Sequence, residues 1–482
     1  MNSLKSIIIH LLLVHFLSVS ITFGQDFNCF SILTGKDASA DGSVLFAHNE
    51  DDWGDRIVNI YKVPVSEELQ SMINSGDTIH MVPSGEMWSY FWLEMPEMEF
   101  SDSYMNQWGV TISSDACPSR EDNPDLTDGG IGYMLRMNMA RRARSAREAV
   151  RIGGELIETY GYTSSGRTYC IADPNEAWML AVVHGKQWVA QRVPDDHVAV
   201  IPNYYTISSV NLEDTINFYG SENLVVYAME RGWFNPETEG EFSFRKAYGN
   251  PESLVNMINI VRHWSALQLL SDRPYEIHEE FPFSYAPERK VELRDLFRIL
   301  RNHNEGSQYD YSKNYTLGHP HGFEKTICAE TTQYGFVAQL RSHLPHETGL
   351  VIWLAPFRPC VHPFVPVYFG VTEMPEGFYT GDHNTAMETH FEQIGDVFEF
   401  AAENNFLEFV KHAREVDMDY VNRIGKISEE IESFENELLS NQESFERKTA
   451  ALIRENNEKA AKTINEYVSD HWKISLEMIK DH

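Results

Sequence analysis

Cys29 is the residue of this chain best placed to do chemistry, because it stands at the start of a predicted β-hairpin. Strand-like runs follow it directly and recur at 43–49, and turn-forming residues at 35–42 separate the two runs. An antiparallel hairpin about this turn brings Cys29 beside a small polar group, consisting of His48, Asn49 and Asp51. A thiol at the start of such a strand is suited to nucleophilic attack on a carbonyl carbon.

The main chain of Cys29 can supply the base that this attack needs. An N-terminal α-amine has an ordinary pKa of about 7.7 to 8.0, so a useful fraction is neutral near neutral pH and can accept the thiol proton. A free amine at Cys29 requires removal of every residue before it. We expect a cut between Asn28 and Cys29, made by Cys29 itself through attack on the preceding carbonyl (autoprocessing).

The first 24 residues have the pattern of a secretory signal peptide. Lys5 precedes an apolar run at 7–17, which is too short to span a bilayer, and small residues lead to a cleavage site after Gly24. Residues 25–28 would then be a short propeptide. We expect an exported protein, periplasmic or extracellular, with no stable insertion in a membrane once the signal is removed.

The overall charge argues against nucleic acid as a partner. The chain has 482 residues, with 72 acidic against 39 basic side chains and a formal charge of −33, so a phosphate backbone would be repelled. A hydrophobic content of 42% is ample for a large core.

The cysteine count is too low for a disulfide scaffold, and its odd value leaves at least one free thiol in an exported protein. Besides Cys29, the sequence leaves four cysteines open as buried thiols or as up to two bridges: Cys117, Cys170, Cys328 and Cys360. Potential metal ligands occur only as short-spaced pairs without a matching second half: His319 with His321, His343 with His346, and Cys360 with His362. We therefore expect neither a metal nor another cofactor.

The remaining patterns predict strands at both ends of one catalytic domain with helices between them, an α+β arrangement. Strands are expected around 106–115, in a meander at 168–193, and at 198–201, 349–354 and 365–371. Helices are expected from the capping residue Ser145 to Gly161, from Asn250 onward, and at about 291–301.

The last hundred or so residues are almost free of Pro and Gly and carry a heptad-like apolar stripe. One interpretation is a helical hairpin packed against the body or on itself. The other is a dimer seam or partner site, which would give a homo-oligomer through these helices. We place the catalytic domain at 29–380 and the helical region, packed on or beside it, at 381–482.

Several segments resemble the dipeptidase family of cysteine-type Ntn hydrolases, which also includes the secernins. The opening run from Cys29 to Ser43, followed by His48-Asn-Glu-Asp51, carries the resemblance. Later blocks agree with it in family order, at 108–110, 172–178, 185–194, 324–331, 345–353 and 366–371. The resemblance covers essentially the whole chain after the leader. It implies a four-layer αββα sandwich and peptidase activity on short peptides.

The resemblance also implies roles for individual residues. Cys29 is at the nucleophile position, Asp51 falls where a carboxylate orients the new α-amine, and Asn203 matches an asparagine of the oxyanion hole. Each of the last two has a structural alternative, since Asp51 can cap a turn and Asn203 can hold a tight bend after Pro202.

We count His48, Asn106 and Lys325 as candidate substrate-binding residues. Family members usually carry arginine where this chain has His48 and Lys325. Histidine is largely neutral at pH 7 and cannot grip a carboxylate as a guanidinium does, so the substrate preference of this chain is open.

The sequence thus favours an exported cysteine-type dipeptidase or related exopeptidase. Two alternatives have different consequences. One is an N-acyl amide hydrolase of the penicillin or bile-salt type, and the other is an inactive exported binding protein of the same fold.

Overall fold

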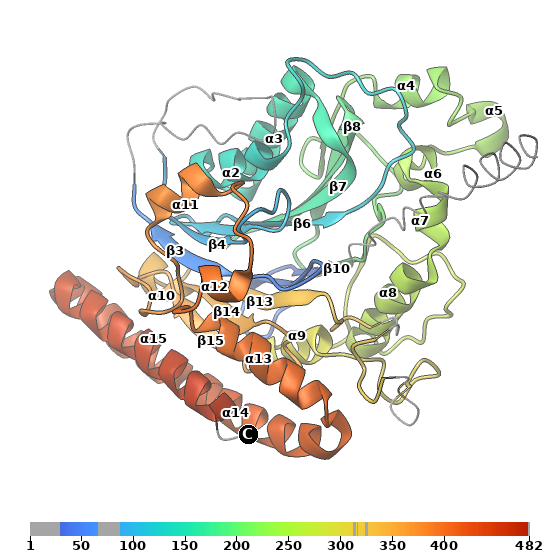
Figure 1. The fold of residues 1–482 in the computed structure, drawn as a ribbon. Helices are drawn as coiled ribbons and strands as arrows, with labels where there is room; N and C mark the ends of the chain where they lie inside the picture. Colours follow the sequence, from blue (N-terminus) through green and yellow to red (C-terminus); the bar gives the residue numbers. More distant parts are fainter. Residues whose placement is uncertain (1–28, 66–86, 312–314, 316, 323–325, 481–482) are drawn as a thin grey trace, which may run out of the picture.

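The computed structural model describes residues 29–65, 87–311, 315, 317–322 and 326–480 (Figure 1). The expected signal peptide and propeptide, with Asn28, lie outside the described residues, as does Lys325.

The hairpin expected after Cys29 is at the centre of a seven-stranded antiparallel sheet. It consists of β1 (Phe30–Thr34) and β2 (Val44–Asp51). The sheet order is β12 (Ser284–Tyr285), β10 (Val198–Ile201), β1, β2, β13 (Thr332–Leu340), β14 (Leu350–Pro356) and β15 (Val365–Tyr368). Every strand of this sheet is buried along most of its length except the short β12, as expected for a sheet covered on both faces.

The second sheet has eight antiparallel strands and is largely a meander. Its order is β11 (Phe218–Gly220), β9 (Trp188–Val193), β8 (Ala177–Gly185), β7 (Tyr162–Ala172), β6 (Thr111–Ala116), β5 (Ser103–Asn106), β4 (Tyr90–Glu94) and β3 (Asn59–Val63). The strands expected at 106–115 and 168–193 are part of it.

The two sheets face one another, and helices cover their outer faces. Alternate residues of β8 show the layering: Met179 and Ala181 join the core shared with the seven-stranded sheet, whereas Trp178 and Leu180 join the core beneath α2 (Tyr133–Arg142) and α3 (Ala146–Tyr160). On the other side, α8 (Met257–Leu270) contacts β10, and α9 (Leu293–Leu300) contacts β2 and β13 (Figure 1). The αββα sandwich expected from the sequence is confirmed.

Helix α3 begins and ends where its sequence signals predict. The hydroxyl of Ser145 accepts a hydrogen bond from the backbone N–H of Glu148 and so caps the first turn. Gly161 ends the helix with a φ of 80°, a conformation that glycine adopts without steric cost.

Long helices at the C-terminal end lie along one side of the sandwich. Helix α13 (Phe406–Asp417) contacts both α14 (Tyr420–Glu455) and α15 (Asn457–Lys480), which pack side by side, and α15 also contacts β15 (Figure 1). Val468 and Trp472 of α15 belong to the same core as the strands. The buried guanidinium of Arg341 donates to both carboxylate oxygens of Glu446 at 2.7 and 2.6 Å, which fixes α14 to the end of β13.

Shorter helices complete the described part of the chain: α4 (Leu224–Glu230), α5 (Pro236–Glu239), α6 (Phe244–Tyr248), α7 (Pro251–Val255), α10 (His346–Gly349), α11 (His383–Thr389) and α12 (Val397–Phe400). Across the described ranges, no helix combines the length and apolar character needed to cross a membrane.

Candidate active site

Cys29 is at the wall of a cavity of about 630 Å³. Cys29 is buried, with 1% of its surface exposed to solvent. Its Sγ donates a hydrogen bond to Glu50 Oε1 at 3.2 Å and lies 3.7 Å from the main-chain oxygen of Asp51. A cavity of this size holds a small organic molecule. The thiol is therefore both sheltered from bulk water and within reach of a bound ligand.

The register of the hairpin places Glu50 opposite Cys29. Phe30 pairs with Asn49 across the β1–β2 ladder, so the residue before Phe30 faces the residue after Asn49. Side chains alternate between the two faces of a strand, so Glu50 shares the face of Cys29 and Asp51 points to the other face. From the sequence we expected His48, Asn49 and Asp51 beside the thiol, and Glu50 was missed.

His48 lies behind Glu50 and does not line the cavity. Its ring is fully buried, with Nε2 at 3.0 Å from Glu50 Oε2 and at 2.8 Å from Ser113 Oγ. On the other side of the ring, Nδ1 is 2.7 Å from the hydroxyl of Ser31, which donates to Asp115 Oδ2 at 2.7 Å. His48 thus holds the carboxylate that faces the thiol.

Burial and negative charge keep the Cys29 thiol protonated. Burial raises the pKa of Cys29 well above its ordinary value, and the carboxylates of Glu50, Asp115 and Asp51 raise it further, against a smaller lowering effect of Arg167. Reaction as a thiolate therefore requires a base that takes the proton as attack occurs.

Asp51 is a buried carboxyl group with spare hydrogen-bonding capacity. Neither of its side-chain oxygens makes a hydrogen bond of normal geometry within the described residues. Burial raises the pKa of Asp51 well above its usual range, and the nearby Thr332 side chain and the charge of Arg262 offset only part of this rise. A cation placed beside Asp51 would satisfy it.

Asn203 lines the cavity and is held in one orientation. It follows β10 with a φ of 57°, a left-handed conformation that asparagine tolerates better than most residues. Its Nδ2 donates to the main-chain oxygen of Ala116 at 3.1 Å, and its Oδ1 accepts from Arg262 Nη2 at 2.8 Å. The tight bend that the sequence offered as an alternative is present, and the side chain also points into the site.

Arg262 joins Asn203 to the residue that carries the thiol. This fully buried guanidinium of α8 donates through Nη1 to the main-chain oxygen of Cys29 at 3.2 Å, while Nη2 bonds Asn203 and Asn259. No motif marks Arg262 in the sequence, because its role depends on where α8 packs.

The rest of the cavity wall is strongly acidic. Five carboxylates line it: Glu50, Asp52, Glu97, Glu99 and Glu252. Among the described residues that line it, the positive charge comes from Arg167, whose guanidinium lies over the ring of Phe100 and donates to Ser114 Oγ at 3.3 Å. Arg167 was not among the residues expected from the sequence.

Asn106 lies outside this cavity. Its Nδ2 donates to the main-chain oxygens of Ala140 and Ala143, both at 2.7 Å, and its Oδ1 accepts from the N–H groups of Trp108 and Val110. These bonds use the whole amide to hold the β5–β6 turn against α2, so the proposed site does not include Asn106.

Known proteins resemble this chain over most of its length. The model of peptidase family C69 matches residues 103–418. A probable dipeptidase of Latilactobacillus sakei is 26% identical over 368 residues, covering 73% of this chain and 76% of that protein. A dipeptidase of Bifidobacterium longum is 27% identical over 382 residues, covering 70% of this chain and 71% of that protein.

Among solved structures, penicillin V acylase from Agrobacterium tumefaciens matches 68% of this chain and 82% of its own, with 12% identity and a TM-score of 0.35.

Proposed function

The chain belongs to peptidase family C69, whose members are cysteine-type peptidases, and we propose that it is a dipeptidase with Cys29 as an N-terminal nucleophile. The observation that carries the proposal is the position of the Cys29 thiol at the wall of the acidic cavity, beside a hydrogen-bond acceptor. Removal of residues 1–28, by export and a second cut, is part of the proposal.

The α-amine of Cys29 serves as the base. Once the bond to Asn28 is cut, the neutral amine takes the proton from Sγ, and the thiolate attacks the scissile carbonyl carbon. The same proton then passes from the ammonium to the leaving amine, and a thioester forms on Sγ. Water hydrolyses the thioester and regenerates the thiol and the free acid.

Asp51 orients the new amine. An ammonium group formed during the reaction requires an anionic partner in this buried place, and the Asp51 carboxyl group has both oxygens available for it. This pairing would also lower the raised pKa of Asp51.

Asn203 supplies a donor for the oxyanion. Its Nδ2 uses one hydrogen for Ala116, which leaves the second for a ligand in the cavity. The hydrogen bond from Arg262 to Oδ1 fixes the orientation of the amide, so that Nδ2 and not Oδ1 is available to the ligand. A preorganised donor of this kind stabilises the tetrahedral intermediate more than the substrate.

The charges of the cavity suit a short peptide with both termini free. Such a peptide brings one ammonium and one carboxylate, and the wall offers five carboxylates and the guanidinium of Arg167. We assign the ammonium to the acidic wall and the carboxylate to Arg167, which presents a planar fork to it. An N-acyl amino acid lacks the ammonium and would meet uncompensated negative charge.

A substrate panel with two variants tests this function. Wild-type enzyme is expected to hydrolyse dipeptides faster than the matching N-acyl amino acids, and Cys29→Ala is expected to be inactive and to keep the bond between residues 28 and 29. Cys29→Ser is the matched control, because its weaker nucleophile should retain slow processing. Full activity of Cys29→Ala would refute the mechanism, and preference for N-acyl substrates would refute the assigned specificity.

A further inference from the structure

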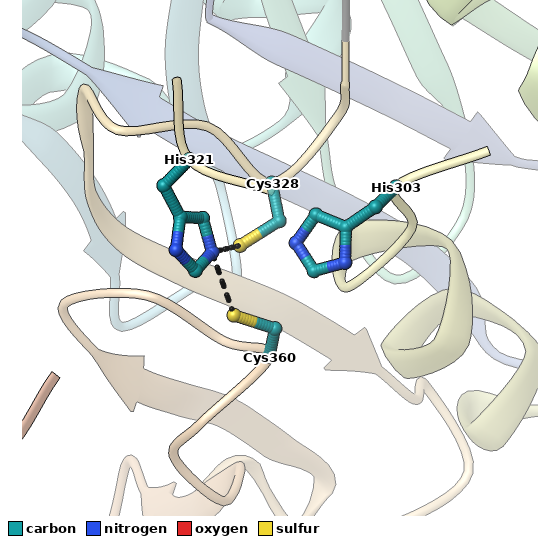
Figure 2. A group of neighbouring side chains, drawn as sticks. All are labelled: His303, His321, Cys328 and Cys360. Carbon is teal, nitrogen blue, oxygen red and sulfur yellow. Dashed lines mark hydrogen bonds between the residues drawn. The ribbon is translucent and has the colours of Figure 1, made fainter. Parts of the chain in front are cut away.

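Four buried side chains outside the active site converge on one point (Figure 2). His303 follows α9, His321 and Cys328 precede β13, and Cys360 is in the connection between β14 and β15. One ligand atom from each, two imidazole nitrogens and two sulfurs, lies within 4.8 Å of all the others. None of the four lines the cavity at Cys29.

The distances within this cluster approach those around a tetrahedral metal ion. His321 Nε2 is 3.1 Å from Cys360 Sγ and 4.0 Å from Cys328 Sγ. Around zinc, with bonds of about 2.0 to 2.3 Å, tetrahedral ligand atoms are separated by roughly 3.3 to 3.8 Å. Small side-chain movements would therefore bring the four atoms to bonding positions.

Carboxylates set the orientation of both histidines. His321 Nδ1 is 2.7 Å from Asp417 Oδ1, and His303 Nδ1 is 3.0 Å from Glu305 Oε1. A carboxylate accepts the proton on Nδ1, which leaves the Nε2 lone pair of each ring for the centre of the cluster. The same pairing of carboxylate, histidine and metal recurs in zinc proteins.

His303 shows that the cluster is incomplete by itself. Its ring is buried, and its Nε2 has no hydrogen-bond partner of normal geometry within the part of the chain that the structure describes. A buried nitrogen lone pair without a partner costs free energy, which a ligand at the centre would remove.

We propose that His303, His321, Cys328 and Cys360 bind one structural zinc ion. Two sulfur and two nitrogen ligands in a closed, buried, tetrahedral arrangement match the structural Cys₂His₂ class, and no position is left for substrate. On binding, each thiol loses its proton to solvent and becomes a thiolate ligand, while both imidazoles bind as neutral groups.

The zinc ion would hold three loops to one another: the one after α9, the one before β13 and the one between β14 and β15. Through these loops it would also hold the C-terminal helices. Asp417, which holds His321, ends α13 and also pairs with Arg358 in the loop that carries Cys360. The ring of Tyr420, at the start of α14, packs edge-on against both histidines. Loss of the metal is therefore expected to loosen these helices before it affects the cavity.

The main rival is a disulfide between Cys328 and Cys360, whose sulfurs lie within the same 4.8 Å. A disulfide would use both sulfurs and abolish the metal site. Two buried histidines would then face each other beside it without a common ligand. The metal content and the thiol state of the full-length protein separate the two cases.

The first test is elemental analysis of the folded full chain, purified without chelator and then exchanged into metal-free buffer. We expect about one zinc per chain, and loss of most of it in Cys328→Ser, Cys360→Ser and His303→Gln. Cys117→Ser and His263→Gln are matched controls, since each changes a buried residue of the same type outside the cluster, and both are expected to keep the zinc.

A second measurement uses only wild-type protein, so it remains valid when the variants fail to fold. Wild-type protein is stripped with a chelator and titrated with Co²⁺, which should give one equivalent with a thiolate-to-cobalt charge-transfer band, and Zn²⁺ should displace it and raise the midpoint of thermal unfolding. A Cys328–Cys360 disulfide in the peptide map would overturn the proposal. So would folded wild-type protein with free thiols that takes up neither Zn²⁺ nor Co²⁺.

Discussion

The two buried cysteine sites of this protein differ in what surrounds the sulfur. At Cys29 the thiol borders an open cavity and faces carboxylates, which keep it protonated and leave one side for a substrate. At Cys328 and Cys360 the sulfurs face imidazole nitrogens on the inside of a closed cluster. A cysteine can act as a nucleophile when it borders a ligand cavity and a base can remove its proton. It has a structural role when other metal-ligand atoms enclose its sulfur.

The two sites also differ in their effect on the stability of the fold. The groups around Cys29 include buried carboxyls such as Asp51 and Asp115 that have unpaired oxygens, so this region lowers stability for the sake of reactivity. The cluster, in contrast, would add stability once its ion is bound.

The largest expected effects come from replacing one cysteine of each site by alanine. Cys29→Ala is expected to lower kcat/KM by at least about 10⁴-fold, because the nucleophile is gone, with little change in the thermal midpoint. Cys328→Ala is expected to do the reverse, lowering the free energy of unfolding by at least about 2 kcal/mol while folded molecules keep their turnover. Enzyme kinetics and calorimetry on both proteins measure this; equal losses of activity and stability in both variants would erase the distinction.

Removal of the proposed oxyanion donor should give the next largest effect. Asn203→Gly keeps the left-handed backbone and removes the amide, so kcat is expected to fall about 10²- to 10³-fold with a smaller change in KM. Asn256→Gly, which alters another amide of the cavity wall, serves as the comparison. An unchanged kcat in Asn203→Gly would exclude Asn203 from the oxyanion hole.

The cost of the buried carboxyls should appear in the pH dependence of stability. Burial raises the pKa of Asp115 from 3.8 to about 6, so the folded chain binds this proton more tightly than the unfolded chain does. Its contribution therefore lowers the free energy of unfolding as pH rises from about 4 through 6, by about 3 kcal/mol.

Asp115→Asn is expected to remove this part of the pH dependence and to be more stable than wild type at pH 7.5. Denaturant unfolding of both proteins at several pH values checks it. The same slope in both proteins between pH 4 and 7 would contradict the assignment.

A smaller effect should follow from neutralising the carboxylate opposite the thiol. Glu50 raises the pKa of Cys29, so Glu50→Gln is expected to lower that pKa and to increase the rate of Cys29 alkylation by iodoacetamide several-fold at neutral pH. Glu97→Gln changes an acidic residue elsewhere on the cavity wall and is expected to alkylate at nearly the wild-type rate. Slower alkylation of Glu50→Gln would mean that Glu50 activates the thiol instead.

Local signals in the sequence predicted much of the fold. The β1–β2 hairpin, the Ser145 cap of α3 and the β7–β9 meander depend on neighbouring residues, and all three are present. The hairpin also implied which residues face Cys29, although the polar group named from the sequence omitted Glu50, the one directly opposite.

Long-range packing decided what the sequence could not show. Arg262 reaches the site only because α8 lies against β10, and no spacing pattern marks it. His321 and Cys360 were each considered as metal ligands, but with their neighbours in sequence. Their partners in the cluster are His303 and Cys328, which the turns after α9 and before β13 bring together.

In the proposed mechanism Cys29 acts with its own free α-amine, and the mass of the N-terminal peptide of active enzyme is the sharpest test of this. We expect a peptide that begins at Cys29, and loss of activity when that amine is selectively blocked. Fully active enzyme in which the bond between Asn28 and Cys29 is intact would contradict it.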